Sequence, residues 1–283
     1  MNSNPMPLNF RERDEWRQFF SSFSHIVLVG NSDRTEPFRL TEAFPQSALF
    51  VFFNKVYKVL NRSFDRPSLL VARSGTSGAN IVHRKEVKDV LSFFPEEALV
   101  GIVNIRVAPS EQFSPKSAFE GAKVYHLDLT SLTKDYPAGK IPTSGFALTL
   151  WLRDLQPAAE IVLAGFSGTR GETWKVFNVH DWTYEQVFLR LCAKRGEIAV
   201  FNQDGDVTRA AALLKSFPDM PPAELLMEMT AVLAERQDSA NDQIDRLMSV
   251  TKFQRGLDAL FRRIRPKTRK QREQARLKKD PNS

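Results

Sequence analysis

The sequence predicts an α/β fold, with a Rossmann-like, mostly parallel sheet flanked by helices and a C-terminal helical extension. Short runs rich in Val, Ile, Leu and Phe recur through the first two thirds of the chain without strict apolar–polar alternation. Such runs are typical of strands buried on both faces of a parallel sheet. Segments with helical spacing separate several of them, as crossover helices do in α/β proteins. The expected strands are Ile26–Val29, Ala48–Phe53, Leu69–Ala72, Leu99–Ile105, Val124–Leu127, Ile161–Ala164 and Ile198–Phe201.

Two of the intervening segments are expected to be helices. Phe146, Leu150 and Leu155 have helical spacing after a turn signal at 142–145, and the apolar residues of 187–192 follow a second polar turn. Thr143 or Ser144 is a natural N-cap for the first helix. We assign residues 1–217 to one Rossmann-like domain.

The character of the chain changes after Phe217. Three prolines, Pro218, Pro221 and Pro222, interrupt regular secondary structure there, and no further proline occurs before residue 266. Pro222 is suited to open a helix, and apolar residues between 226 and 247 recur near a three–four spacing. Residues 218–265 are therefore either one or two surface helices packed on the domain, or a helical hairpin or weak coiled coil used for self-association into a homo-oligomer. Residues 266–283 are a basic tail that is too charged to pack, and we expect it to be disordered.

Composition limits the function classes. The 283 residues are 42% hydrophobic and 26% charged, the balance of a protein with a proper core. The one cysteine, Cys192, excludes an internal disulfide and a cysteine-based metal site. No apolar run approaches the roughly 18 residues that a membrane-spanning helix needs, so the expected location is cytoplasmic. Segment 252–279 carries twelve basic and two acidic residues, a net charge of +10. Since the whole chain has a net charge of +7, the remaining residues together carry −3.

Polar residues follow two expected strands. Gly30, Asn31 and Ser32 come directly after the first strand, and Asn54 ends the second. Because ligands bind at the carboxyl edge of an open α/β sheet, these residues are candidates for holding a nucleotide or phosphate. The alternatives are an ordinary strand-to-helix turn and a strand end closed by the Asn54 side chain.

The two helix entries supply further candidates. Free amides behind Thr143, Ser144 and Gly145 form an anion site at a helix N-terminus, or the segment is simply a capped, buried helix. His180 precedes the second helix, with Glu185 five residues on. A histidine there is a candidate general base, or it is structural while Asp181 serves as the N-cap.

The chain lacks several common motifs. It has no GxGxxG dinucleotide fingerprint, no P-loop and no HExxH or EF-hand metal site. No cofactor or metal is therefore expected.

Taken together, the four segments resemble the sialylmotifs of the CMP-sugar-dependent sialyltransferases of glycosyltransferase family 29. Val29–Ser32 matches the Val-Gly-Asn-Ser opening of the large motif, and Phe53–Asn54 resembles its end. Pro142–Gly145 and Gly165–Phe166 resemble the two ends of the small motif. His180 and Glu185 have the spacing of the very small motif, and all four occur in the family's order.

The chain also departs from that family. Golgi members link the large and small motifs by a disulfide, but neither motif contains a cysteine here, which a bacterial relative would explain. The family's His-Tyr motif has no clear counterpart in this chain. Bacterial family-42 sialyltransferases share a similar Thr-Ser-Gly helix entry, so both families stay open.

The resemblance implies an inverting, metal-independent transfer of a 2-keto acid sugar, Kdo (3-deoxy-manno-octulosonic acid) or sialic acid, from CMP to a glycan. It implies His180 as the general base and Glu185 as an orienting residue. Asn31 and Asn54 would hold CMP, and Thr143–Gly145 would bind the donor.

The basic tail, beside a short apolar stripe at 253–264, is typical of an interfacial helix on an anionic membrane. We therefore expect a lipopolysaccharide-core acceptor and a peripheral position on the inner membrane, against the alternative of a tail that only adds solubility. The competing hypotheses are a non-catalytic member, another nucleotide-dependent α/β enzyme such as a methyltransferase, and a nucleic-acid-binding or membrane-binding protein acting through its tail. Nucleic acid is disfavoured because the tail has no aromatic residue after Phe261.

Overall fold

One parallel sheet organises the chain. The computed structural model describes residues 13–31, 36–75, 80–166, 179–201, 216 and 220–264. The chain divides into two compact units, Met1–Val207 and Thr208–Ser283. The first contains a seven-stranded sheet in the order β5-β4-β3-β2-β1-β6-β7, with every neighbouring pair parallel. The strands are β1 (His25–Val29), β2 (Leu49–Phe53), β3 (Ser68–Arg73), β4 (Leu99–Arg106), β5 (Val124–Asp128), β6 (Glu160–Ala164) and β7 (Ala199–Phe201).

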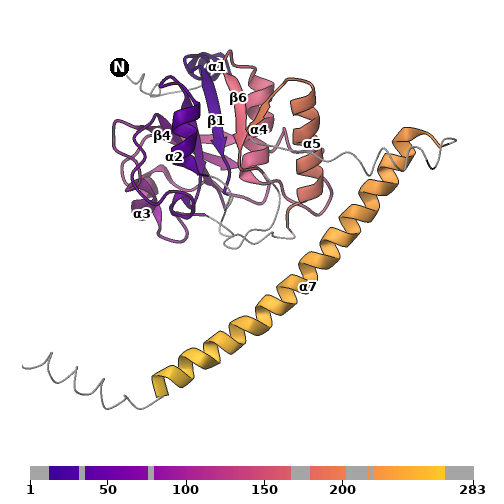
Figure 1. Ribbon diagram of the computed structural model, residues 1–283. Coiled ribbons are helices and arrows are strands. Elements are labelled where there is room, and N and C mark those ends of the chain that lie inside the picture. Colours follow the sequence, from indigo (N-terminus) through magenta and orange to yellow (C-terminus); the bar gives the residue numbers. More distant parts are fainter. Residues whose placement is uncertain are drawn as a thin grey trace, which may run out of the picture. The chain divides into compact units, whose positions relative to one another are not determined.

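Helices cover both faces of the sheet (Figure 1). The predicted α/β, Rossmann-like fold is thus confirmed, and each expected strand forms within one residue of its predicted ends. The described helices are α1 (Arg13–Ser21), α2 (Pro37–Ala43), α3 (Val87–Leu91), α4 (Ser144–Leu155), α5 (Trp182–Lys194) and α7 (Pro222–Ile264), with 3₁₀ turns η1 (Val56–Lys58) and η2 (Lys116–Phe119).

The sheet has a separate apolar core on each face. Alternate residues of β1 belong to different cores: Ile26 and Leu28 pack with α1, α4 and α5, whereas Val27 and Val29 pack with α2 and α3. Because successive side chains of a strand point to opposite faces, a strand covered on both sides must be apolar throughout. This burial explains why the runs lack alternation.

The strand order reverses beside β1. The chain builds outward from β1 to β5 and then returns through α4 to place β6 on the other side of β1. Val29 lies in register with Ala164, so the carboxyl ends of β1 and β6 lie side by side. This is the topological switch point, where ligands bind in open α/β sheets.

The C-terminal extension is a single helix. Helix α7 begins at Pro222, as predicted, and continues without interruption to Ile264. The helical hairpin considered for this segment is therefore wrong. The basic tail, 266–283, lies outside the described residues. Within the described part of the chain, no helix is long and apolar enough to cross a membrane.

Candidate active site

The switch point carries the first group of predicted residues. The Gly30 amide donates to the Ala164 carbonyl at 2.7 Å and so extends the β1–β6 ladder by one residue. The Asn31 side-chain amide nitrogen lies 3.4 Å from the Phe53 carbonyl, while its buried Oδ1 has no partner among the described residues. A buried acceptor without a described partner at a switch point is a candidate contact for a ligand donor. Ser32 lies outside the described residues.

Both predicted glycines accommodate Phe166. A Cβ on Gly145 would lie 2.5 Å from the Phe166 ring, and a Cβ on Gly30 would lie 2.7 Å from the Gly165 carbonyl oxygen and 3.0 Å from the same ring. The ring also packs edge-on against Phe53, at 6.1 Å between centroids. Gly30 and Gly145 therefore let Phe166 fix the ends of β1, β2 and β6 against the start of α4.

Asn54 stabilises the chain itself. It adopts a left-handed backbone conformation with φ of 48°, and its Oδ1 accepts the Arg73 amide at 2.8 Å. The side chain therefore closes the end of β2 against the end of β3, which is the structural alternative considered for this residue.

The N-terminus of α4 faces the same edge of the sheet. Thr143 is its N-cap, and the Thr143 hydroxyl accepts the Phe146 amide at 3.1 Å. The amides of Ser144 and Gly145 have no acceptor within the helix, because the first turn of a helix leaves its donors unpaired. Their dipoles favour an anion at this point.

Glu185 joins α5 to the entry of α4. Its side chain is 3% exposed, and its carboxylate accepts the Thr143 amide at 2.7 Å, the Thr143 hydroxyl at 2.6 Å and the Tyr136 hydroxyl at 2.9 Å. Burial raises the pKa of Glu185 to about 7, opposed by these donors and by the Arg73 charge. Glu185 therefore ties the N-cap of α4 and the Tyr136 loop to α5.

Tyr136 extends this network to the start of α5. Its hydroxyl donates to Glu185 and accepts the Asp181 amide at 2.8 Å. Asp181 is the N-cap of α5, with its side chain accepting the Tyr184 amide at 2.9 Å. Burial, followed by the Glu185 charge, raises the pKa of the Tyr136 phenol. This hydroxyl therefore stays protonated and acts as donor and acceptor at once.

Ile141 holds His180 and the residue before it. The Ile141 amide donates to the Val179 carbonyl at 2.8 Å, and the Ile141 carbonyl lies 2.6 Å from His180 Nδ1. Because a carbonyl oxygen only accepts, Nδ1 carries the proton and Nε2 remains as the basic nitrogen. Burial, together with the charges of Arg73 and Lys140, lowers the His180 pKa, and the Ile141 carbonyl opposes this. The ring is therefore neutral at neutral pH.

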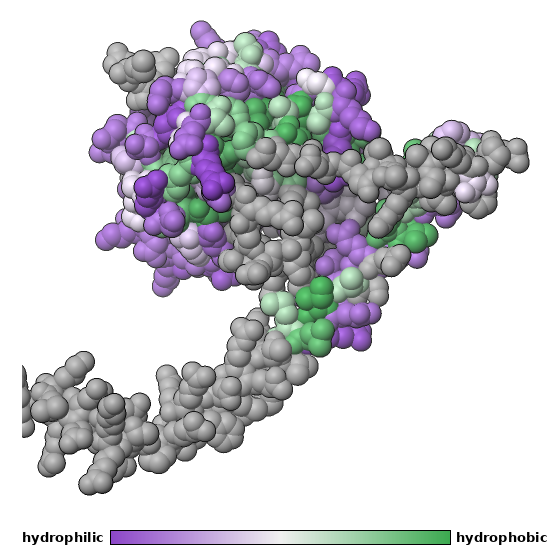
Figure 2. Space-filling view, viewed as in Figure 1, coloured by the Kyte–Doolittle hydropathy of each residue, from purple (hydrophilic) through white to green (hydrophobic). Residues whose placement is uncertain are grey.

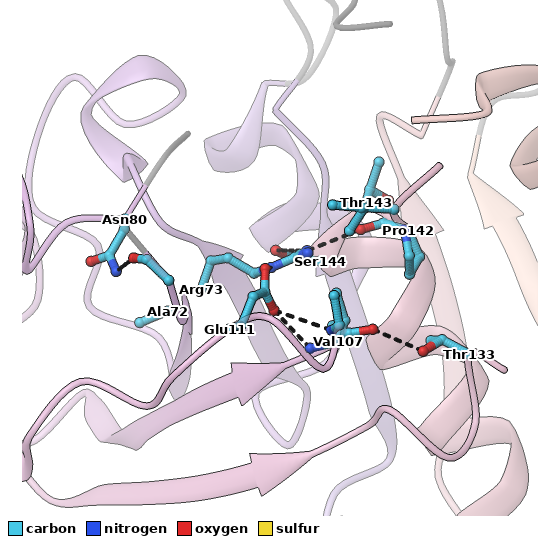
Figure 3. Close-up of polar contacts among 12 residues, drawn as sticks. Ala72, Arg73, Asn80, Val107, Glu111, Thr133, Pro142, Thr143 and Ser144 are labelled. Atoms are coloured by element: carbon cyan, nitrogen blue, oxygen red, sulfur yellow. Dashed lines mark hydrogen bonds and ion pairs between the residues drawn. The ribbon is translucent and has the colours of Figure 1, made fainter. Parts of the chain in front are cut away.

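Arg73, at the end of β3, belongs to the same cluster although no sequence motif points to it. Its Nε donates to Glu111 at 2.6 Å, and its Nη1 donates to the Pro142 carbonyl at 2.9 Å and reaches the Ser144 hydroxyl at 3.5 Å. Figure 3 shows the side chain between Glu111 and the 142–144 turn. The Arg73 guanidinium and the positive N-terminal end of the α4 dipole therefore lie close together.

A short chain of contacts holds Glu111 in place. Its second carboxylate oxygen accepts the Val107 amide at 2.8 Å, and the Val107 carbonyl accepts the Thr133 hydroxyl at 2.9 Å (Figure 3). Arg73 is thereby linked to the loop that leads to Tyr136.

The arrangement places the neutral imidazole of His180 near Arg73, which is paired with Glu111, and near the amides at the start of α4. It brings together His180, Glu185 and Thr143–Gly145, with Gly30 joined through Phe166. Asn31 lies at the switch point, and Asn54 supports the neighbouring strand end. Among the described residues there is no cluster of three metal-ligating side chains.

A groove lies beside this site. Its volume is about 1010 Å³, and it runs along α4 and α5 past Tyr136, Phe146 and Tyr184. His180 and Arg73 do not line it, so the groove is separate from the part of the candidate site that holds these two residues.

Two residues of the candidate site, Arg73 and Tyr136, belong to no sequence motif, for different reasons. Arg73 had a detectable signal, because it is a charged residue directly after a fully apolar strand. Tyr136 lies in a loop with no pattern of its own, and only the tertiary fold brings it to Glu185.

Comparison with known proteins adds no family assignment: no protein-family model matches the chain, and no curated protein matches it.

Proposed function

We propose that this protein is an inverting, metal-independent glycosyltransferase that moves a 2-keto acid sugar, Kdo or sialic acid, from CMP to a glycan acceptor, with lipopolysaccharide core as the favoured acceptor. The observation that carries the proposal is the neutral His180, with Nε2 as its basic nitrogen, beside Arg73 and the N-terminus of α4.

The base supplies the proton transfer. His180 Nε2 takes the proton of the acceptor hydroxyl while the hydroxyl oxygen forms a bond to the anomeric carbon, and the bond from that carbon to the CMP phosphate breaks. A base that is neutral at neutral pH can accept this proton, and such catalysis contributes roughly 10²–10⁴-fold.

The departing CMP needs a positive environment. Charge develops on the phosphate as the glycosidic bond breaks, and preorganised positive groups stabilise that charge. Arg73 and the amides of Ser144 and Gly145 are suited to this role, because the Arg73–Ser144 contact puts both at one point. The Oδ1 of Asn31, which has no partner among the described residues, is suited to accept a hydrogen bond from the nucleotide.

The test is to measure binding and hydrolysis of CMP-Kdo and CMP-sialic acid, with CMP, S-adenosylmethionine and NAD as comparison ligands. We expect selective binding of CMP compounds. His180→Ala should lower turnover at least about 100-fold with little change in CMP affinity.

The matched control is His25→Ala, because His25 begins β1 and so lies at the opposite edge of the sheet. This variant should keep full turnover. Retained activity in His180→Ala would remove His180 from the mechanism. Binding without turnover when acceptor is supplied would favour the non-catalytic alternative, and absence of CMP binding would refute the proposal.

A further inference from the structure

Helix α7 has an apolar seam that the described residues leave open to solvent. Leu226, Leu233 and Leu247 lie at whole multiples of seven residues from one another, and their exposed fractions are 45%, 53% and 66%. The green groups along α7 in Figure 2 are exposed apolar side chains. A helix of 43 residues is about 65 Å long, and long helices draw most of their stability from packing an apolar face.

The spacing of the seam is that of a left-handed coiled coil. Taking Leu226 as position a, the a and d positions up to residue 264 number twelve, and nine of them are apolar. The exceptions are Arg236, Gln243 and Gln254. A strict seven-residue repeat keeps one seam facing a partner helix only if the helices supercoil.

The charge pattern identifies the partner and its direction. Residues 222–245 contain six acidic and one basic residue, whereas residues 246–264 contain five basic and one acidic residue. Two parallel copies would set acidic half beside acidic half. Two antiparallel copies pair acidic with basic halves and also oppose the two helix dipoles.

The core positions favour the same direction. In an antiparallel pair centred on residue 245, every a position meets a d position: Leu226 meets the partner's Ile264, and Leu233 meets the partner's Leu257. Arg236 then meets the partner's Gln254, whereas a parallel pair would place two arginines together in the core. Like charges in a core are destabilising, and polar residues there select register and orientation.

We infer that α7 binds the α7 of a second copy of this chain as an antiparallel coiled coil, making the protein a homodimer. The occupant is specified by the complementary halves of α7 itself. This inference does not depend on the proposed catalytic function.

The first test measures the mass of the full chain by light scattering across a wide range of protein concentration. We expect a dimer. Replacing both Leu233 and Leu247 with Asp should halve the mass. Met227→Asp is the matched control, because Met227 is 67% exposed and lies off the seam; it should remain dimeric.

The second test fixes the direction by disulfide trapping in a Cys192→Ser background. A mixture of Leu226→Cys and Ile264→Cys chains should give a cross-linked pair, while Leu226→Cys alone should not. Efficient cross-linking of Leu226→Cys to itself would overturn the antiparallel arrangement.

The inference is also wrong if the chain is monomeric at every concentration. A monomer whose α7 instead binds anionic vesicles through Leu233 and Leu247 would assign the seam to a membrane.

Discussion

At the scale of single residues, the buried carboxyl group of Glu185 makes the stability of the folded chain depend on pH. Glu185 accepts three hydrogen bonds from Thr143 and Tyr136, all of which favour its charged form. Burial acts in the opposite direction and dominates, which raises the pKa to about 7. Folding therefore strengthens proton binding at Glu185.

The sign of the resulting pH dependence follows from linkage. Between about pH 4.5 and pH 7 the folded chain keeps a proton on Glu185 that the unfolded chain has lost. The free energy of unfolding contributed by Glu185 therefore falls as pH rises through this range. His180 acts oppositely, because its lowered pKa makes stability rise with pH up to about 6.5.

Glu185→Gln isolates the contribution of the Glu185 carboxyl group to the pH dependence of stability, because glutamine has the same shape and does not titrate. We expect urea unfolding to show wild type losing more stability than this variant between pH 5 and pH 8, by about 3 kcal/mol at most. Glu97→Gln, at an exposed position, should follow wild type. Superimposable pH curves for wild type and Glu185→Gln would show that folding leaves this pKa unchanged.

At the scale of elements, the site depends on how the entries of α4 and α5 are joined. The Tyr136 hydroxyl connects Glu185 with the Asp181 amide, and the Ile141 carbonyl holds the His180 ring. His180 and the N-terminus of α4 belong to different helix entries, so this junction sets their separation.

Tyr136→Phe tests the junction by removing one oxygen atom. The Asp181 amide loses its acceptor and Glu185 loses a donor, which should cost about 1–3 kcal/mol of unfolding free energy. Turnover of the CMP-sugar should fall, while CMP affinity changes little, because Arg73 and α4 keep their own contacts. Tyr57→Phe, at an exposed tyrosine, is the control. Equal losses of affinity and turnover in Tyr136→Phe would mean that Tyr136 does not act specifically on the base.

The elements differ in how far sequence alone predicts them. Strands such as β2 and β6 were predicted within one residue because burial on both faces demands an uninterrupted apolar run. The sequence offers Thr143 or Ser144 as one N-cap and Asp181 as an alternative for the other, and the structure has Thr143 and Asp181, because capping is local chemistry. The Arg73–Glu111 pair joins residues 38 positions apart, and no local pattern encodes such a contact. The hairpin, one of the alternatives for 218–265, does not form because no turn interrupts α7.

At the scale of the molecule, charge is separated along the chain. The twelve basic residues between 252 and 279 give the C-terminal segment a charge of +10 on a chain whose remainder is −3. An anionic membrane attracts such a segment by about 1 kcal/mol for each basic residue near the surface. This attraction would bring the proposed transferase to a lipid-linked acceptor without a spanning helix.

Deleting residues 266–283 tests this membrane role while leaving α7 intact. The deletion removes seven basic and two acidic residues, so binding to vesicles containing anionic lipid should weaken at least tenfold. Wild-type binding should also weaken as salt increases, because salt screens exposed charges, and vesicles of neutral lipid should bind neither form. The deleted chain should still hydrolyse the CMP-sugar, since every described site residue precedes residue 202. Vesicle binding that is unchanged by the deletion would assign the tail to solubility, whereas tail-dependent binding of RNA but not of vesicles would favour the nucleic-acid alternative.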